Sequence, residues 1–290
     1  MCIRDSSTDD THEVAEDLAN LHQVVRVVEN PSGRTPDGLN LAIEATTADV
    51  IVRVDARSFL PDNYVRNAVE TLDATGAANV GAVQVPQGQT LVEQGIAAAM
   101  RSRLGNGGAT YRTDPDRRRV DMAWLGVFRR GPLTSVGGYD TEFTRNQDAE
   151  LNIRLGKAGH EVWLDPRLVV LYRPRGSIKA LARQFGQYGW WRARTIRKHP
   201  DSARLRQALP PLAVLALGGS ALLSAASPIF LIVPAGYLGA VGVASLVGDE
   251  PPAVKAVMAA SLVTIHMSWG AGFLAGSLRW WLSPTQRAQS

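Results

Sequence analysis

One stretch of the sequence constrains the fold more than any other. Residues 207–248 contain no charged side chain. At about 42 residues, this stretch is long enough for two membrane-spanning helices of roughly 20 residues each. The chain carries 31 Lys and Arg against 27 Asp and Glu, and residues 1–206 hold nearly all of them. The sequence therefore predicts a charged, water-exposed N-terminal part followed by a membrane-associated C-terminal part.

Three apolar segments of the C-terminal part are expected to cross the membrane. They are Leu209–Ala226, Ile229–Val247 and Ala256–Leu278. An alternative is two spans, with the first pair of segments forming a re-entrant hairpin. Basic residues gather just before the first segment: Arg192, Arg194, Arg197, Lys198, Arg204 and Arg206. The positive-inside rule then places the N-terminal domain in the cytoplasm.

Composition excludes several classes of protein. The net charge of +4 is too small to indicate a nucleic-acid binder, so no nucleic-acid partner is expected. Because Cys2 is the only cysteine, an internal disulfide framework or a cysteine-based metal site is excluded. Residues 1–6, Met-Cys-Ile-Arg-Asp-Ser, resemble a translated sequencing adapter. We therefore expect an artefactual start on a truncated gene, the alternative being a short polar N-terminus.

Strand and helix patterns alternate across residues 7–175. The expected strands are Val24–Val28, Val50–Val54, Val80–Val85, Met122–Phe128 and Leu168–Tyr172. The expected helices are Glu13–Leu21, Leu39–Ala45, Asp62–Leu72, Leu91–Leu104 and Asp148–Ala158. This alternation favours an α/β fold with a largely parallel sheet. Ligands bind at the carboxyl ends of the strands in such sheets, so the polar residues there are candidates for a site.

Five polar residues stand out on this basis. Arg34 and Asn40 follow the first expected strand and can reach a nucleotide phosphate or base, or simply belong to a turn. Asp55 follows a buried strand, where a carboxylate suits a ribose hydroxyl or a metal, or equally caps a helix or turn. Asp148 and Glu150 open a helix, where carboxylates complement the helix dipole. The alternative, functional interpretation is that Asp148 is a general base. We expect Asp55 and Asp148 to lie together.

In order along the chain, these pieces resemble an inverting, nucleotide-sugar-dependent family 2 glycosyltransferase with the GT-A fold. Within that family, the sequence is similar to the membrane-attached glucosyltransferases of succinoglycan-type exopolysaccharide synthesis. The motifs are Asp5–Thr11, Asp55-Ala56-Arg57, Gly81–Gly88, Gly105–Gly108, Arg130–Asp140, Asn146–Glu150 and Gln184–Arg192. Each is weak alone, but their order over about 190 residues is distinctive. The resemblance implies a Rossmann-like mixed sheet that lacks its first strands, with transmembrane helices at the C-terminus.

The resemblance also implies roles for individual residues. Asp148 would be the catalytic base. The nucleotide-sugar would be bound by Asp5, Arg34, Asn40, Asp55 and Arg57, and donor and acceptor would be enclosed by Glu150, Gln184, Trp190, Trp191 and Arg192. A Mg²⁺ or Mn²⁺ ion would reach the protein through Asp55. The implied donor is a UDP-sugar and the implied acceptor is polyprenyl-linked or otherwise lipid-linked.

The resemblance further sets the expected organisation of the chain. Residues 7–175 would form a truncated GT-A domain, 176–206 an amphipathic interface segment, 207–278 the transmembrane helices and 279–290 a polar tail. The protein would be a multi-pass protein of the bacterial inner membrane with its catalytic domain in the cytoplasm. An active processive synthase is a less favoured variant, because the Gln184–Arg192 stretch is an imperfect match.

Two departures from the family pattern motivate a different class of function. Arg57 stands where a metal-coordinating Asp is usual, and Gln147 replaces the Glu beside the base. A third departure, Ser6 in place of the motif glycine, falls in the segment expected to be artefactual. The alternative is a non-catalytic membrane scaffold subunit of a polysaccharide assembly, with a degenerate transferase domain. Asp148 and Glu150 argue for the enzyme.

Overall fold

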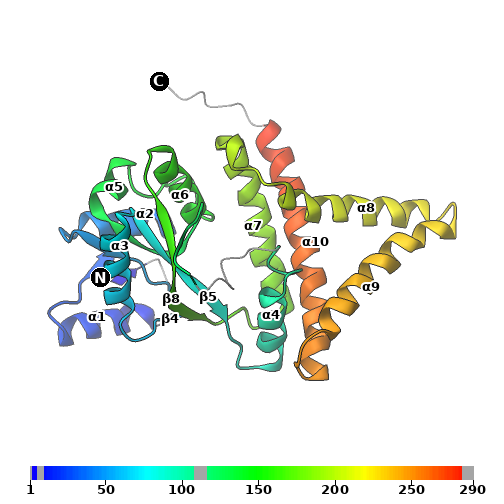
Figure 1. Ribbon diagram of the computed structural model, residues 1–290, viewed down its shortest axis with the longest axis horizontal. Coiled ribbons are helices and arrows are strands. Elements are labelled where there is room, and N and C mark those ends of the chain that lie inside the picture. Colours follow the sequence, from blue (N-terminus) through cyan, green and yellow to red (C-terminus); the bar gives the residue numbers. More distant parts are fainter. Residues whose placement is uncertain (1, 5–9, 108–115, 283–290) are drawn as a thin grey trace. The chain divides into compact units, whose positions relative to one another are not determined.

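The computed structural model describes residues 2–4, 10–107 and 116–282 (Figure 1). Its contacts divide the chain into two compact units. Unit 1 comprises Met1–Asp55, Asp62–Ala82 and Asp116–Leu168, and unit 2 comprises Ala56–Pro61, Val83–Pro115 and Val169–Ser290. Unit 2 thus joins the C-terminal helices to two segments of the N-terminal half. Asp5, expected to contact the nucleotide, lies outside the described residues.

Unit 1 contains most of the predicted strands and helices. Its strands are β1 (Cys2–Arg4), β2 (Val27–Glu29), β3 (Val50–Val52), β6 (Arg118–Arg119) and β7 (Trp124–Arg129). Its helices are α1 (Thr11–Leu21), α2 (Thr35–Glu44), α3 (Tyr64–Thr75), α5 (Arg130–Ser135) and α6 (Gln147–Lys157). Two longer strands, β5 (Asn79–Pro86) and β8 (Val162–Tyr172), begin in unit 1 and end in unit 2.

The strands form a mixed arrangement, as the family resemblance implies. Strands β1 and β2 pair in parallel in a sheet of their own. The larger sheet has the order β3-β7-β5-β8-β4, and β6 also pairs with β8. Its described registers, β3–β7, β5–β7, β4–β8 and β6–β8, are all antiparallel. The prediction of a largely parallel sheet is therefore wrong, because apolar periodicity identifies a strand without fixing its direction.

The core of unit 1 holds α6 and α5 against the sheet. Leu151 and Leu155 of α6 are fully buried with Leu133 of α5, and they pack with Phe128 of β7 and Ile43 of α2. Burying each of these side chains contributes about 1.5–3 kcal/mol. The apolar face of α6 is therefore fixed, and this fixes the direction in which its first turn points.

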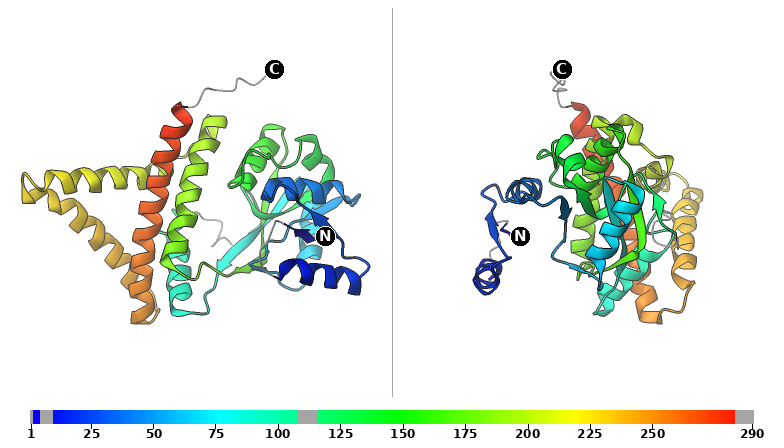
Figure 2. Two further views of the ribbon diagram at one scale, coloured as in Figure 1. Left: turned by 180° about the vertical axis from the view of Figure 1, so that it is seen from behind. Right: turned by 60° about the vertical axis from the view of Figure 1, so that its left-hand side comes forward.

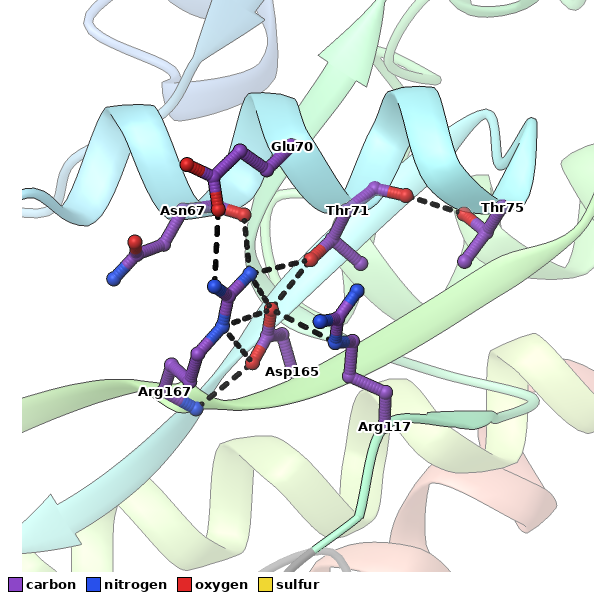
Figure 3. Close-up of polar contacts among 7 residues, drawn as sticks. All are labelled: Asn67, Glu70, Thr71, Thr75, Arg117, Asp165 and Arg167. Carbon is purple, nitrogen blue, oxygen red and sulfur yellow. Dashed lines mark hydrogen bonds and ion pairs between the residues drawn. The ribbon is translucent and has the colours of Figure 1, made fainter.

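A buried ionic network ties β8 to α3 (Figure 3). Asp165 is completely buried in the middle of β8 and accepts hydrogen bonds from the Thr71 hydroxyl and from the backbone and side chain of Arg167. Arg117 adds a longer ion pair, 3.9 Å from the Asp165 carboxylate. The carboxylate charge is thereby compensated, which a buried charge requires. Burial alone would raise the pKa of Asp165, but the hydrogen bonds outweigh burial, and the pKa is lowered.

Unit 2 is mainly helical. It contains the short strand β4 (Ser58–Phe59) and the helices α4 (Leu91–Arg101), α7 (Ile178–Lys198), α8 (Leu209–Leu223), α9 (Ile232–Leu246) and α10 (Pro252–Leu282). Helices α7 and α10 lie side by side in both Figure 1 and Figure 2. Glycines allow the approach, since a Cβ added at Gly189 would lie 2.0 Å from the Trp269 carbonyl oxygen.

The helices that could cross a membrane differ from those expected. Within the described ranges, two segments are long and apolar enough, Pro228–Leu246 and Pro252–Leu282. Helix α8 has only 15 residues, because the chain turns at Ser224. The helix within the first expected span, Leu209–Ala226, is therefore shorter than the roughly 20 residues of a typical span.

Candidate active site

One buried guanidinium joins the two carboxylates that the sequence singles out. Arg53 follows β3, and its side chain is only 8% exposed. Its Nε donates to Asp55 Oδ1 over 2.9 Å, and its Nη1 donates to Asp148 Oδ1. Asp55 and Asp148 are themselves 36% and 26% exposed. The expectation that these two carboxylates lie together is confirmed, and both remain within reach of a ligand.

Local backbone structure places Asp148 at this point. Asn146, immediately before α6, adopts a left-handed conformation with φ of 59°, a conformation that Asn tolerates better than most residues. The helix begins at Gln147, so Asp148 occupies its first turn. There the helix dipole favours a negative charge. Asp148 is therefore held at a helix start that faces the end of β3.

The electrostatics of the three groups are coupled. Burial disfavours the charge of Arg53, but Asp148, Tyr139 and Asp55 outweigh it and raise the Arg53 pKa. Burial raises the pKa of Asp148; Arg53 opposes this rise and Asp55 adds to it. The result is a carboxylate that is easier to protonate than an ordinary Asp yet sits beside a permanent cation. Such a group can accept a proton without losing its position.

Sequence reasoning missed Arg53 and Tyr139. The Arg53 guanidinium lies 5.7 Å from the centre of the Tyr139 ring, an arrangement that stabilises a cation. The Tyr139 ring is buried and packs edge-on against Phe128 at 6.3 Å. A charged residue inside the apolar run Val50–Val54 was the available signal for Arg53. Tyr139 lies in the motif Arg130–Asp140, but the motif gave no reason to single out its side chain.

Arg34 and Asn40, expected to bind a nucleotide, hold a neighbouring segment in the structure. The Asn40 side chain donates to the Tyr139 carbonyl over 2.7 Å and accepts from the Tyr139 amide over 2.8 Å. Arg34 donates to the Thr141 carbonyl and forms an ion pair with Asp37 at 3.5 Å. Both side chains thus fix residues 136–141, which we call the acceptor-side segment because it overlaps the motif Arg130–Asp140, which resembles the acceptor-side segment of the family.

Glu150 supports the same acceptor-side segment indirectly. It is fully buried and pairs with Arg154, whose Nε lies 2.8 Å from Glu150 Oε2. Arg154 in turn donates to the carbonyls of Val136 and Gly138. Because its carboxylate is engaged in the interior, Glu150 is suited to a structural role rather than to enclosing a substrate.

The remaining candidates belong to unit 2. Arg57 is exposed, and its carbonyl accepts from the Arg173 amide over 3.3 Å. Gln184 is buried and donates to the hydroxyls of Tyr172 and Tyr188.

The other three candidates, Trp190, Trp191 and Arg192, lie in the second half of α7, and their partners also belong to unit 2. The rings of Trp190 and Trp191 lie 6.0 and 6.3 Å from that of Trp280. Arg192 donates to Ser202 and Gln207, and burial together with Arg204 and Arg206 lowers its pKa to about 10.

The residues present supply part of a metal site. Among the described residues, no group of three or more His, Cys, Asp or Glu side chains could hold an ion. Asp55 offers one carboxylate, of which Oδ1 is bonded to Arg53. A single carboxylate combined with substrate phosphates is a common way to bind Mg²⁺. Asp55 therefore fits a metal that is shared with a diphosphate, and not one that the protein encloses.

This fold and paired carboxylate site define a GT-A type glycosyltransferase, and comparisons with known proteins agree. The family model described as Glycosyl transferase family 2 matches residues 1–137. The chain is 35% identical over 273 residues to the Succinoglycan biosynthesis protein ExoA of Rhizobium meliloti (strain 1021), covering 92% of this chain and 82% of that protein. The chain therefore belongs to glycosyl transferase family 2.

Two more distant similarities are consistent with this assignment. A dolichyl N-acetyl-alpha-D-glucosaminyl phosphate 3-beta-D-2,3-diacetamido-2,3-dideoxy-beta-D-glucuronosyltransferase of Methanococcus voltae is 24% identical over 200 residues, covering 66% of this chain and 62% of that protein. The mannosyltransferase PcManGT of Pyrobaculum calidifontis, solved with GDP-Man and Mn²⁺, superposes with a TM-score of 0.54 at 18% identity. That superposition covers 96% of this chain and 76% of the mannosyltransferase, and it supports the fold.

Proposed function

We propose that this chain is an inverting glycosyltransferase that moves a glucosyl residue from a UDP-sugar to a lipid-linked saccharide acceptor in exopolysaccharide synthesis. The observation that carries the proposal is the convergence of Asp55 and Asp148 on Arg53. Membership of the family and similarity to a succinoglycan biosynthesis protein support the reaction class and the process.

The proposed reaction is a single displacement at the anomeric carbon. The acceptor hydroxyl oxygen forms a bond to that carbon while the bond to the diphosphate breaks, so UDP leaves and the configuration inverts. The hydroxyl proton passes to the Asp148 carboxylate, which is 26% exposed and so can meet an acceptor. Arg53 keeps Asp148 in place during this transfer.

Asp55 is proposed to bind the donor. Its position three residues beyond the end of β3 suits a contact with the ribose or with the diphosphate. Mg²⁺ or Mn²⁺, when bound between Asp55 and the diphosphate, would neutralise charge on the leaving group. The exposed guanidinium of Arg57 is proposed to contribute positive charge to the same donor.

The proposed location is the cytoplasmic face of the bacterial inner membrane. The basic residues between Arg192 and Arg206 precede the uncharged stretch, and the positive-inside rule assigns such residues to the cytoplasm. A polyprenyl-linked acceptor is held in the same membrane, so enzyme and acceptor would meet in two dimensions.

The test compares two substitutions in the complete chain with its membrane. Asp148→Asn should reduce sugar transfer by at least ~10²-fold and leave donor binding unchanged, because the base acts only in the transition state. Asp55→Asn should weaken both donor binding and transfer, because it contacts the ground-state donor. Transfer is followed from UDP-[¹⁴C]glucose to extracted lipid acceptor, and binding is measured separately by calorimetry.

Asp62→Asn is the matched control, since Asp62 is an exposed carboxylate of the same unit. Transfer that persists in Asp148→Asn would refute the base assignment. Absence of transfer from every nucleotide-sugar in the unmodified protein would favour the non-catalytic scaffold.

A further inference from the structure

Helices α8 and α9 expose apolar side chains on nearly every side. In Figure 1 and Figure 2 they form a hairpin that projects from α10 within unit 2. Only 11% of the segment Pro228–Leu246 is buried. The exposed large side chains include Leu212, Leu215, Leu222, Ile229, Leu238 and Val243, each more than half exposed. A surface of this size and character requires an apolar partner, and lipid acyl chains suit a hairpin without any charge.

The turn of the hairpin pairs its own backbone amide groups. The amide groups of residues 224, 225, 226 and 227 all donate to carbonyls of residues 220, 222 and 223, over 2.9–3.3 Å. Pro228 has no amide hydrogen to satisfy. The Ser220 and Ser224 hydroxyls donate to the carbonyls of Phe230 and Ala221. Backbone groups left unpaired in hydrocarbon are costly, so the pairing of these amide groups is one property that a membrane-buried turn needs.

The first arm of the hairpin, α8, is short for a complete crossing, although the second arm, Pro228–Leu246, is long enough. Helix α8 has 15 residues, which gives a length of roughly 22 Å at 1.5 Å per residue. The hydrocarbon core is about 30 Å thick. The turn Ser224–Pro228 carries no charge, whereas a loop that emerges on the far side usually ends in polar residues.

Helix α10 is long and apolar enough to cross, but the contacts along its first half argue otherwise. A Cβ added at Gly95 of α4 would lie 2.4 Å from Val257, and the Leu104 carbonyl lies 3.1 Å from His266 Nε2, so α4 and the residues after it cover this half. Helix α4 is itself charged: Glu93 pairs with Arg173 at 2.9 Å, and Arg101 pairs with Glu250 at 2.8 Å. A helix covered by such a neighbour is not surrounded by hydrocarbon over that length.

Helix α7 carries charge along the length that packs on α10. Lys179 and Arg183 are exposed in its first half, and Arg194 and Lys198 lie in its second half. Such a helix is suited to the membrane surface, with its basic residues at the level of the lipid phosphates. A partner that lies alongside it, as α10 does, then shares that level.

We propose that the α8–α9 hairpin enters the membrane and turns inside the hydrocarbon without crossing it, while α7 and α10 stay together at the surface. The partner of the hairpin is the acyl-chain region of the leaflet that it enters. Both ends of α10 and the start of α8 then face the same side of the membrane. This proposal does not depend on which sugar is transferred.

Single cysteines test the proposal, because Cys2 is the only native cysteine and Cys2→Ser removes it. Four exposed positions receive one cysteine each: Ala203, Ala226, Asp249 and Leu282. A membrane-impermeant maleimide is applied to spheroplasts, which present the outer side, and to inverted vesicles, which present the cytoplasmic side. Positions 203, 249 and 282 should be labelled only in inverted vesicles. Ala226→Cys should be labelled in neither, and only after detergent is added.

Each other labelling pattern overturns the proposal. Labelling of Ala226→Cys in spheroplasts would mean that the hairpin crosses, and labelling in inverted vesicles would mean that it lies in water or on a protein partner. Labelling of Leu282→Cys in spheroplasts would mean that α10 crosses. As a second measurement, Ala226→Arg should abolish accumulation in the carbonate-washed membrane fraction, whereas the control Ala203→Arg should not. Equal accumulation of the two arginine variants would also refute a buried turn.

Discussion

Replacing Arg53 by Met tests the coupling at the centre of the site. The substitution keeps most of the side-chain volume but removes the cation that bonds Asp55 and Asp148. Removing one partner of a buried ion pair costs 3–5 kcal/mol, because it leaves an uncompensated charge. The two carboxylates are 36% and 26% exposed, so water compensates part of their charge. We therefore expect the free energy of unfolding to fall by about 3 kcal/mol at neutral pH, the low end of that range.

The pH dependence gives the sharper result. Arg53 opposes the rise in the Asp148 pKa that burial causes, and Asp55 adds to that rise. Without the guanidinium, Asp148 should hold its proton to higher pH. The acid limb of the pH–rate profile, where Asp148 must lose its proton to act as a base, should therefore move to higher pH. Transfer measured from pH 4 to 9, together with urea unfolding at each pH, follows both effects.

Arg53→Lys is the matched control for this experiment. It keeps a positive charge but lacks the planar guanidinium that reaches two carboxylates at once. Its acid limb should lie between those of the native chain and Arg53→Met. If Arg53→Met unfolds at the native urea concentration and keeps the native acid limb, the guanidinium neither supports the site nor influences Asp148.

Three further predictions concern other parts of the chain. Asp165→Asn should lower the free energy of unfolding by about 2 kcal/mol at pH 7, as expected for loss of charged hydrogen bonds. Because the Asp165 pKa is lowered when folded, with Arg167 outweighing burial, the stabilisation is complete above the ordinary Asp pKa and is lost as the pH falls through the folded value. The native and Asn proteins should thus converge in stability in acid, and a constant difference in urea titrations would contradict this. Gly189→Leu should lower the melting temperature in detergent, because its Cβ would meet a backbone carbonyl of α10 at 2.0 Å. Gly218→Leu is the control and should leave the melting temperature unchanged, because a Cβ there has nothing within 4 Å. Arg57→Asp should make transfer more dependent on added Mn²⁺ if Arg57 stands in for a metal ligand; an unchanged Mn²⁺ titration would reject that role.

The existence of the helices was predictable, but the pairing of strands was not. The structure has a helix at each expected helical segment of the N-terminal half, with ends displaced by a few residues. Strand β8 begins at Val162, well before the expected Leu168. The polar sequence Asp165-Pro166-Arg167 interrupts its apolar pattern, and the prediction therefore started the strand too late. That sequence is tolerated in a strand because Thr71 and Arg167 pair with the buried carboxylate. Such compensation comes from distant residues, so local periodicity does not reveal it.

The candidate site was predictable where a residue follows an apolar strand or opens a helix, as Asp55 and Asp148 do. Asn40 and Glu150 carry the same kinds of polar atoms, yet they bond to the backbone of the acceptor-side segment and to Arg154. A sequence shows that a side chain has hydrogen-bonding capacity without showing whether the protein itself uses it. Arg53 shows the reverse case, a charge inside an apolar run that only the fold explains.

The acceptor-side segment, residues 136–141, is held almost entirely through its main chain. Arg34, Asn40 and Arg154 all donate to carbonyl oxygens there, at Val136, Gly138, Tyr139 and Thr141. Carbonyl groups are the same in every residue, so these hydrogen bonds themselves do not depend on the side chains of the segment. Gly137 and Gly138 are nevertheless required, because both have positive φ, of 81° and 67°, and Tyr139 is required because its ring is buried against Arg53. The tolerance to substitution that main-chain attachment allows is therefore confined to Val136, Asp140 and Thr141.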